Sequence, residues 1–241
     1  MDTASLDHLM DRASHALTRM DYLTCEDLCM QALARAREAA DWPYYARILM
    51  PLQEARRQRR LIAADGAIRL GTSRRQSADK WLSSLQAGCL LLTYPHTAAD
   101  ARQLDAEARH ERRHIELLLA DNPIDDDHYR ITSFRGPSVS CVVAAPPVDW
   151  RDIWLAPGER PEPGAEDDGD VTAGGDTEPG RTPADWFLDA AEALGDAAIQ
   201  HVTADEGDVE RIEQLEAMLA VATDHEILHQ RLGDAARAMA R

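Results

Sequence analysis

The stretch Cys89-Leu90-Leu91-Leu92-Thr93-Tyr94-Pro95-His96-Thr97-Ala98-Ala99-Asp100 holds a strand signal followed directly by a helix start. The apolar run Cys89–Tyr94 is short and is stopped by Pro95, a pattern typical of a buried strand. Thr97 and Asp100 have the spacing of a capping box, in which two side chains satisfy free backbone N–H groups at the start of a helix. The sequence therefore predicts a strand followed by a helix at the centre of the chain.

Similar signals lie on both sides of this unit. A strand over Ala67–Leu70 and a helix from Ser77 to about Leu85 are predicted before it, and a strand over Ile115–Ala120 is predicted after it. Two further runs, Tyr129–Phe134 and Val139–Ala144, flank Arg135-Gly136-Pro137 and predict a hairpin. Three strands that alternate with helices and end in a hairpin are typical of a small α/β domain, which we place over residues 65–155.

The first 64 residues are predicted to be helical. Apolar residues recur at intervals of three and four over residues 4–19, from Cys25 to Ala36, and from Tyr44 to about Ala63. Asp41-Trp42-Pro43 separates the second run from the third, with Pro43 in the first turn of the third helix. Pro51 lies inside that helix, where a proline removes one hydrogen bond.

The turn between the first two helices carries the motif of a known repeat family. The stretch Met20-Asp21-Tyr22-x-x-Cys25-(x)6-Ala32-Leu33 resembles the second half of a tetratricopeptide repeat, usually Gly-Asp-Tyr-x-x-Ala-(x)6-Ala-Leu. Small residues at positions 25 and 32 allow paired helices to approach closely. Met20 stands where the family has a turn glycine.

A second block near the other end is similar to the first helix of the same repeat. It reads His229-x-x-Leu232-Gly233-x-Ala235-Ala236, against Trp-x-x-Leu-Gly-x-Ala-Tyr in the family, so both large aromatic residues are missing. The two blocks are separate, and no regular 34-residue period connects them. The resemblance implies paired helices whose surface binds a peptide or protein segment.

The last third of the chain divides into a linker and a helical segment. Residues 156–182 hold 6 of the 13 glycines and 8 acids against 2 arginines, a composition that does not bury enough apolar area to fold. Residues 183–241 predict three amphipathic helices, over Ala184–Thr203, Val209–Ala222 and Asp224–Met239. The predicted fold class is therefore α+β and α-rich, with helical segments at 1–64 and 183–241 flanking the α/β domain.

Composition narrows the classes of partner. The formal net charge is −17, which argues against a general binder of nucleic acid or anionic membranes. No apolar run approaches the ~20 residues of a membrane span, and the four cysteines show no paired spacing, so a reduced, cytoplasmic protein is expected. Lys80 is the only lysine, a bias that suggests a bacterial genome rich in G and C.

The string His-Glu-x-x-His, which holds zinc in many metalloproteases, occurs twice. In the first copy, His110 is predicted to end a helix and His114 to start a strand, so the two imidazoles do not share a face. In the second copy, His225 and His229 share a helical face, with Asp224 as the expected N-cap. The twelve residues that follow contain no His, Glu or Cys as a third ligand. We therefore predict no metal and no other cofactor, and keep a zinc protein that uses His110, His114, His225 and His229 as the second alternative.

Two other groups of residues are candidate sites. The basic cluster Arg56, Arg57, Arg59 and Arg60 suits an acidic partner, although it also suits a solvated helix end or the chain's own acidic linker. The ends of two predicted strands carry Thr72, Ser73 and Arg74, and Tyr94 and His96. Because ligands bind beyond the carboxyl ends of strands in open α/β sheets, these residues are candidates for a pocket that binds phosphate-containing ligands.

The function that the sequence favours is non-catalytic. We expect a protein-interaction or scaffold protein that uses a helical-repeat-like surface, with the four arginines as the contact. The first alternative is small-ligand binding or enzyme activity at the strand ends. It requires that those side chains converge in one pocket.

Overall fold

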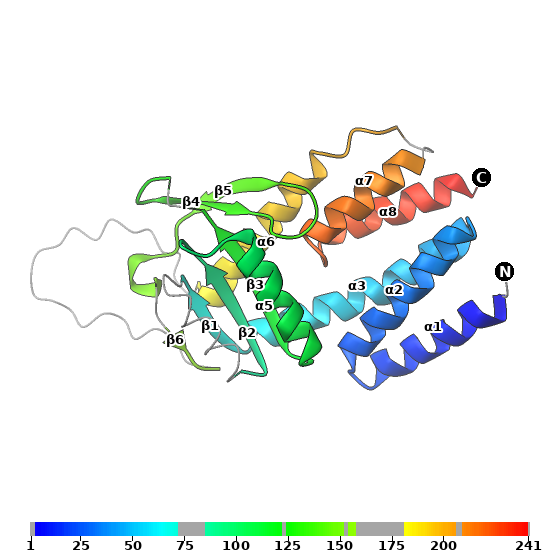
Figure 1. Cartoon of the computed structure of the whole chain (residues 1–241), viewed down its shortest axis with the longest axis horizontal. Helices are drawn as coiled ribbons and strands as arrows, with labels where there is room; N and C mark the ends of the chain where they lie inside the picture. Colours follow the sequence, from blue (N-terminus) through cyan, green and yellow to red (C-terminus); the bar gives the residue numbers. More distant parts are fainter. Residues whose placement is uncertain are drawn as a thin grey trace, which may run out of the picture. The chain divides into compact units, whose positions relative to one another are not determined.

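The computed structural model describes residues 3–71, 85–121, 124–151, 154–157, 181–205 and 209–240 (Figure 1). These residues form two compact units. One is a helical unit of residues 1–61, 135–139 and 194–241, and the other is an α/β unit of residues 62–134 and 140–193. The fold is α+β, with helices flanking a small mixed sheet.

The α/β unit is built on a six-stranded sheet in the order β5-β4-β3-β2-β1-β6. The strands β1 (Ala67–Leu70), β2 (Ala87–Leu92) and β3 (His114–Ala120) run parallel to one another, as the alternation of strands and helices predicts. The hairpin of β4 (His128–Thr132) and β5 (Ser140–Ala144) continues the sheet antiparallel to β3. The short β6 (Trp154–Leu155), which the sequence does not predict, pairs antiparallel with β1.

Helix α5 (Ala98–His110) covers one face of this sheet (Figure 1). Its apolar face meets alternate residues of the strands in a buried cluster that includes Ala101, Leu104, Leu90, Leu92 and Leu117. The residues between them, such as Leu91 and Leu118, are buried as well. Burial of both faces explains why the central strands are continuous apolar runs instead of alternating ones.

Most predicted elements of the α/β unit are confirmed, with boundaries shifted by one or two residues. The capping box is present, since the Thr97 hydroxyl accepts from the Asp100 N–H and the Asp100 carboxylate accepts from the Thr97 N–H at 2.9 Å. The predicted helix Ser77–Leu85 lies almost wholly outside the described residues, as does most of the predicted linker 156–182. A 3₁₀ turn, Val148–Trp150, precedes β6.

The helical unit is formed by helices from both ends of the chain. It contains α1 (Thr3–Thr18), α2 (Tyr22–Glu38), most of α3 (Trp42–Ala64), the end of α6 (Pro183–Ile199), α7 (Val209–Val221) and α8 (Glu226–Met239). The segment 135–139 also belongs to this unit, and there Gly136 (φ +64°) lies against the α7 backbone at Ala217. The predicted helices at 1–64 and 183–241 thus contribute to one unit, although α6 begins in the α/β unit.

Two turns of the same design join α1 to α2 and α2 to α3. In each, a residue with positive φ follows the helix: Met20 (φ 59°) in the first turn and Ala40 (φ 51°) in the second. The next residue is an aspartate whose backbone N–H returns to the preceding helix, from Asp21 to Ala16 and from Asp41 to Ala36. Each aspartate then caps the next helix by accepting a backbone N–H with its carboxylate. The tight turns therefore rest on left-handed residues that are not glycine.

Replacing Ala40 by glycine is expected to stabilise the helical unit by about 0.5–1 kcal/mol. A side chain in the left-handed region is strained, and glycine removes that strain at a smaller entropic cost. Thermal and urea unfolding followed by circular dichroism would measure the gain. Ala34→Gly, at an exposed position within α2, is the matched control and should destabilise by about 1 kcal/mol. Equal destabilisation by both changes would contradict the left-handed conformation at Ala40.

Candidate functional site

The predicted arginine cluster leads to the most elaborate polar site in the described residues of the helical unit. On α3, Arg56 and Arg59 continue the line of buried residues Tyr45, Leu49 and Leu52 at spacings of three and four. Both arginines are therefore carried into the interior by the helix itself. Their relative exposures are only 8% and 2%, which is rare for arginine unless it is paired.

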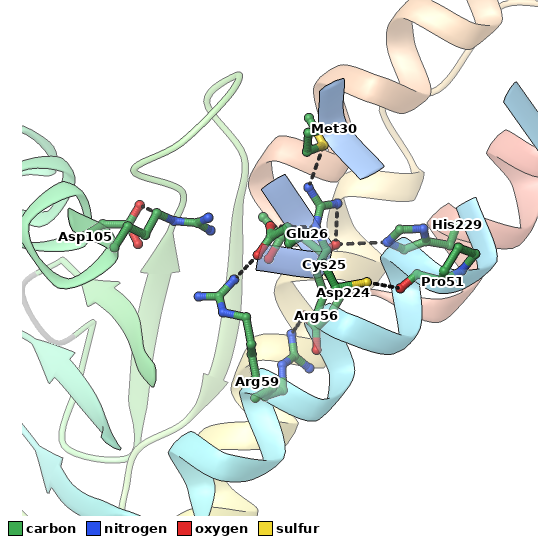
Figure 2. A network of polar contacts seen from close by, with 12 residues as sticks. Cys25, Glu26, Met30, Pro51, Arg56, Arg59, Asp105, Asp224 and His229 are labelled. Atoms are coloured by element: carbon green, nitrogen blue, oxygen red, sulfur yellow. Dashed lines mark hydrogen bonds and ion pairs between the residues drawn. The ribbon is translucent and has the colours of Figure 1, made fainter. Parts of the chain in front are cut away.

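Glu26 of α2 pairs with both guanidinium groups (Figure 2). Arg56 Nε donates to Glu26 Oε1 at 2.9 Å, and Arg59 donates to the other oxygen of the same carboxylate. Glu26 is itself buried, on the face of α2 that also carries Tyr22, Cys25 and Cys29. Buried ion pairs of this kind contribute little when intact, but removing one partner is costly because it leaves a buried charge.

Arg56 also reaches the connection between α7 and α8. Its Nη1 donates to the Thr223 carbonyl at 2.9 Å, and the same carbonyl lies 3.0 Å from His229 Nε2 (Figure 2). The neighbouring Asp224 pairs with Arg60. Two arginines of α3 thus bind the connection between α7 and α8, one at the Thr223 carbonyl and one at the Asp224 carboxylate.

A second polar link joins the same helices at Glu216 of α7. The Tyr45 hydroxyl donates to Glu216 Oε1 at 2.6 Å, and Arg37 pairs with the same carboxylate and with Glu213. Burial raises the pKa of Tyr45 to about 12, so the phenol stays protonated and remains a donor. The two links hold α2 and α3 to α7 and α8 within the helical unit.

These contacts correct the prediction that the four arginines form an exposed binding patch. Arg56 and Arg59 are buried, and Arg60 is largely buried beside Asp224. Arg57 alone of the four is exposed. Four arginines within five residues favour a solvated surface by composition, but Arg56 and Arg59 lie on the buried face of α3 and Arg57 lies on its exposed face.

In the second His-Glu-x-x-His string, the first histidine caps a helix. His225, not Asp224 as predicted, is the N-cap of α8, and its Nδ1 accepts the Leu228 N–H at 3.4 Å. Its ring lies against Gly195 of α6, and its Nε2 is 3.5 Å from Asp196 Oδ1. Asp224 is engaged with Arg60 instead. The imidazole of His225 therefore has an assigned role as a helix cap.

His229 is held neutral inside the helical unit. Burial, aided by the nearby Arg56 guanidinium, lowers the pKa of His229 to about 4. In the neutral ring, Nε2–H donates to the Thr223 carbonyl, while Nδ1 is buried without a hydrogen-bond partner among the described residues. Charges from two further residues act on the ring: Glu26 opposes the lowered pKa, and His225 adds to it.

Lowering the pH from 7.5 to 5 is expected to destabilise the helical unit through His229 by about 2 kcal/mol. Its pKa is lower in the folded state than the ordinary 6.5, so its contribution is complete above pH 6.5 and is lost as the pH falls toward 4. Urea unfolding at several pH values would measure the slope. His229→Gln keeps a donor near Thr223 but does not titrate. Its loss of stability between pH 7.5 and 5 should therefore be smaller by about 2 kcal/mol. An unchanged slope would contradict the neutral histidine.

The first His-Glu-x-x-His string is interrupted, as predicted. Helix α5 ends at His110, Glu111 is its C-cap, and β3 begins at His114. Arg112, between the two histidines, has a φ of +58° and turns the chain out of the helix. Because the string is not helical, its two imidazoles do not share a helical face. The two strings belong to different units.

The candidate ligand pocket at the strand ends is described only in part. Thr72, Ser73 and Arg74 lie outside the described residues. Tyr94, which forms a cis peptide bond with Pro95, is 69% exposed, whereas His96 is 7% exposed, so these two side chains face different surroundings. The Asp100 carboxylate already accepts a hydrogen bond from the Thr97 N–H at the start of α5. A negative side chain at this helix start disfavours an anionic ligand there.

The cysteine pair of α2 is buried in the helical unit. Cys25 and Cys29 are free thiols with no exposed surface, and Cys25 Sγ lies 3.9 Å from the Pro51 carbonyl. A hydrogen bond to Cys25, together with burial, raises the pKa of the Cys29 thiol. The same hydrogen bond lowers the pKa of Cys25. Cys25 is one of the two small-residue positions of the repeat motif quoted above, and Cys29 lies one turn further along the same buried face of α2.

Metal-binding groups and membrane-spanning helices are both absent from the described part of the chain. Within it, no group of three or more His, Cys, Asp and Glu side chains is placed to hold a metal ion. No helix in the described ranges is long and apolar enough to cross a membrane.

Glu26 is the central residue that sequence reasoning missed, although a signal was present. It lies four residues after Tyr22 and three before Cys29, so it falls on an apolar face of α2. Arg56 and Arg59 likewise continue an apolar line on α3. Opposite charges on the apolar faces of two consecutive helices predict a buried ion pair.

Comparison with known proteins gave no match to this chain among protein-family models, curated proteins or solved structures.

Proposed function

We propose that this chain is a non-catalytic interaction protein whose helical unit presents a preformed surface to a protein or peptide partner. The observation that carries the proposal is the network around Glu26. The buried Glu26, Arg56 and His229 fix the helices of this unit to one another. The charged groups that could serve chemistry there bind one another instead. A surface that is fixed before binding loses less entropy when a partner docks.

The resemblance to tetratricopeptide repeats supports the same proposal by analogy. The α1–α2 pair has the Asp21-Tyr22 turn and the buried small residues Cys25 and Ala32 of that motif. Paired helices of this kind bind extended or helical segments of other proteins. Fold analogy does not fix function, so the proposal needs a direct test.

The test is photo-crosslinking of the full chain in its native cells. Benzoylphenylalanine is placed at one exposed position at a time on the helical unit: Met50 of α3, Gln31 of α2 and Ile227 of α8. We expect a covalent protein adduct from at least one position, and its loss when Glu26→Gln loosens the unit. Absence of a protein adduct from all three positions would overturn the proposal.

A further inference from the structure

The solvent-facing line of α3 combines apolar side chains with arginines. Its exposed residues are Pro43, Arg47, Met50, Arg57 and Leu61, which recur at spacings of three, four and seven, and the half-buried Glu54 completes the line. We call these six residues the α3 stripe. Met50 is 77% exposed and Leu61 is 42% exposed. Single exposed apolar side chains are common on protein surfaces, so what distinguishes this line is that Met50 and Leu61 share it with two arginines.

The two arginines of the α3 stripe are available for an incoming group. Arg57 makes no ion pair or hydrogen bond with the described residues, in contrast to its neighbours Arg56 and Arg60. The Arg47 guanidinium carbon lies 5.2 Å from the centre of the Tyr44 ring, which supports the flat group from one side. Glu54, the stripe's one acid, is engaged by Gln58 at 2.8 Å. With two arginines against one carboxylate the stripe carries a net charge of about +1, in a chain whose net charge is −17.

The geometry points to a partner of one chemical class. We infer that the α3 stripe binds an acidic amphipathic helix of another protein, a proposal that rests on the proposed function and names its surface. Spacings of three and four match the seam along which two helices pack. Exposed methionine and arginine are the residue types enriched at protein interfaces. The partner supplies apolar side chains for Met50 and Leu61 and carboxylates for Arg47 and Arg57.

The length of the stripe fits such a helix. Met50 and Leu61 are eleven residues apart on α3, which is about 16 Å along the helix axis. A partner helix of roughly four turns spans this distance and reaches both arginines. Two arginines among apolar side chains give few phosphate contacts, so the stripe suits a carboxylate-bearing helix better than a nucleic acid.

The experiment compares Met50 of the stripe with Ile227 of α8, which is 42% exposed in the same unit. Benzoylphenylalanine is placed at each position in the full chain, and adducts formed in native cells are mapped by mass spectrometry. We expect the Met50 adduct to carry a segment with net negative charge and helical apolar spacing. A synthetic peptide of that segment should then bind the purified chain in fluorescence anisotropy.

Charge reversal completes the test. Arg57→Glu should weaken peptide binding at least tenfold, whereas Arg231→Glu, at an exposed arginine of α8, should change it less than twofold. A protein adduct from Ile227 without one from Met50 would overturn the stripe but leave the proposed function standing. A Met50 adduct with nucleic acid, lipid, a basic segment or a second copy of this chain would also overturn it. Absence of a protein adduct from all three positions, Met50, Gln31 and Ile227, would overturn both proposals.

Discussion

Replacing Glu26 by glutamine is expected to lower the free energy of unfolding of the helical unit by about 3–5 kcal/mol. The substitution keeps the shape of the side chain but removes the carboxylate that accepts from both Arg56 and Arg59. Both guanidiniums are buried, so neither recovers hydration when that carboxylate is lost. Urea unfolding followed by circular dichroism at neutral pH would measure the loss.

Two comparisons separate the buried charge from other effects of the change. Glu213→Gln removes an ion pair with Arg37, but the Glu213 side chain is 59% exposed, so the expected loss is below about 1 kcal/mol. Replacing Glu26, Arg56 and Arg59 together by leucine or methionine should recover much of the stability lost in Glu26→Gln. A Glu26→Gln variant as stable as Glu213→Gln would show that the Glu26 charge is not buried as described.

Replacing Gly195 by alanine is the second change with a large expected effect, a destabilisation of about 2–3 kcal/mol. A Cβ at this position of α6 would lie 2.2 Å from Cδ2 and 2.6 Å from Cγ of His225. The His225 ring has no exposed surface, and moving it breaks its bond to the Leu228 N–H. The steric cost therefore exceeds the ~1 kcal/mol by which alanine favours a helix over glycine.

Gly233 provides the matched control in α8. A Cβ there would meet only the end of the flexible Arg237 side chain, at 3.4 Å, so Gly233→Ala should stabilise by up to about 1 kcal/mol. Adding His225→Ser to Gly195→Ala should restore most of the lost stability, because serine leaves room and still caps the helix. Thermal unfolding of these variants would check the contact, and equal effects of Gly195→Ala and Gly233→Ala would contradict it.

The sequence was sufficient to predict the secondary structure where local signals are strong. The capping residues Thr97 and Asp100, the stop at Pro95 and the apolar run of β3 place the parallel strands and α5 within one or two residues. The interruption of the first His-Glu-x-x-His string followed from the same boundaries. Strand β6 was missed because two residues carry no periodicity, and only their pairing with β1 makes them a strand.

The candidate site was less predictable because it depends on contacts between distant segments. Whether Arg56 is solvated or buried is decided by Glu26 and by the Thr223 carbonyl, 30 and 167 residues away in sequence. The N-cap of α8 moved from Asp224 to His225 for a similar reason, since Asp224 pairs with Arg60. Local preference favours aspartate at a cap, but a tertiary ion pair outweighs it here.

The assembly of the helical unit from residues 1–61 and 194–241 has a consequence for biosynthesis. The ribosome releases α2 and α3 long before α7 and α8 exist, because the Thr223 carbonyl that accepts from Arg56 lies 167 residues further along the chain. Contacts between such distant segments form late and slowly. Translation that halts within the α/β unit would leave α1–α3 with their inward faces uncovered, a feature that chaperones and proteases recognise. Completion of the helical unit thus requires that the chain has been translated through α8.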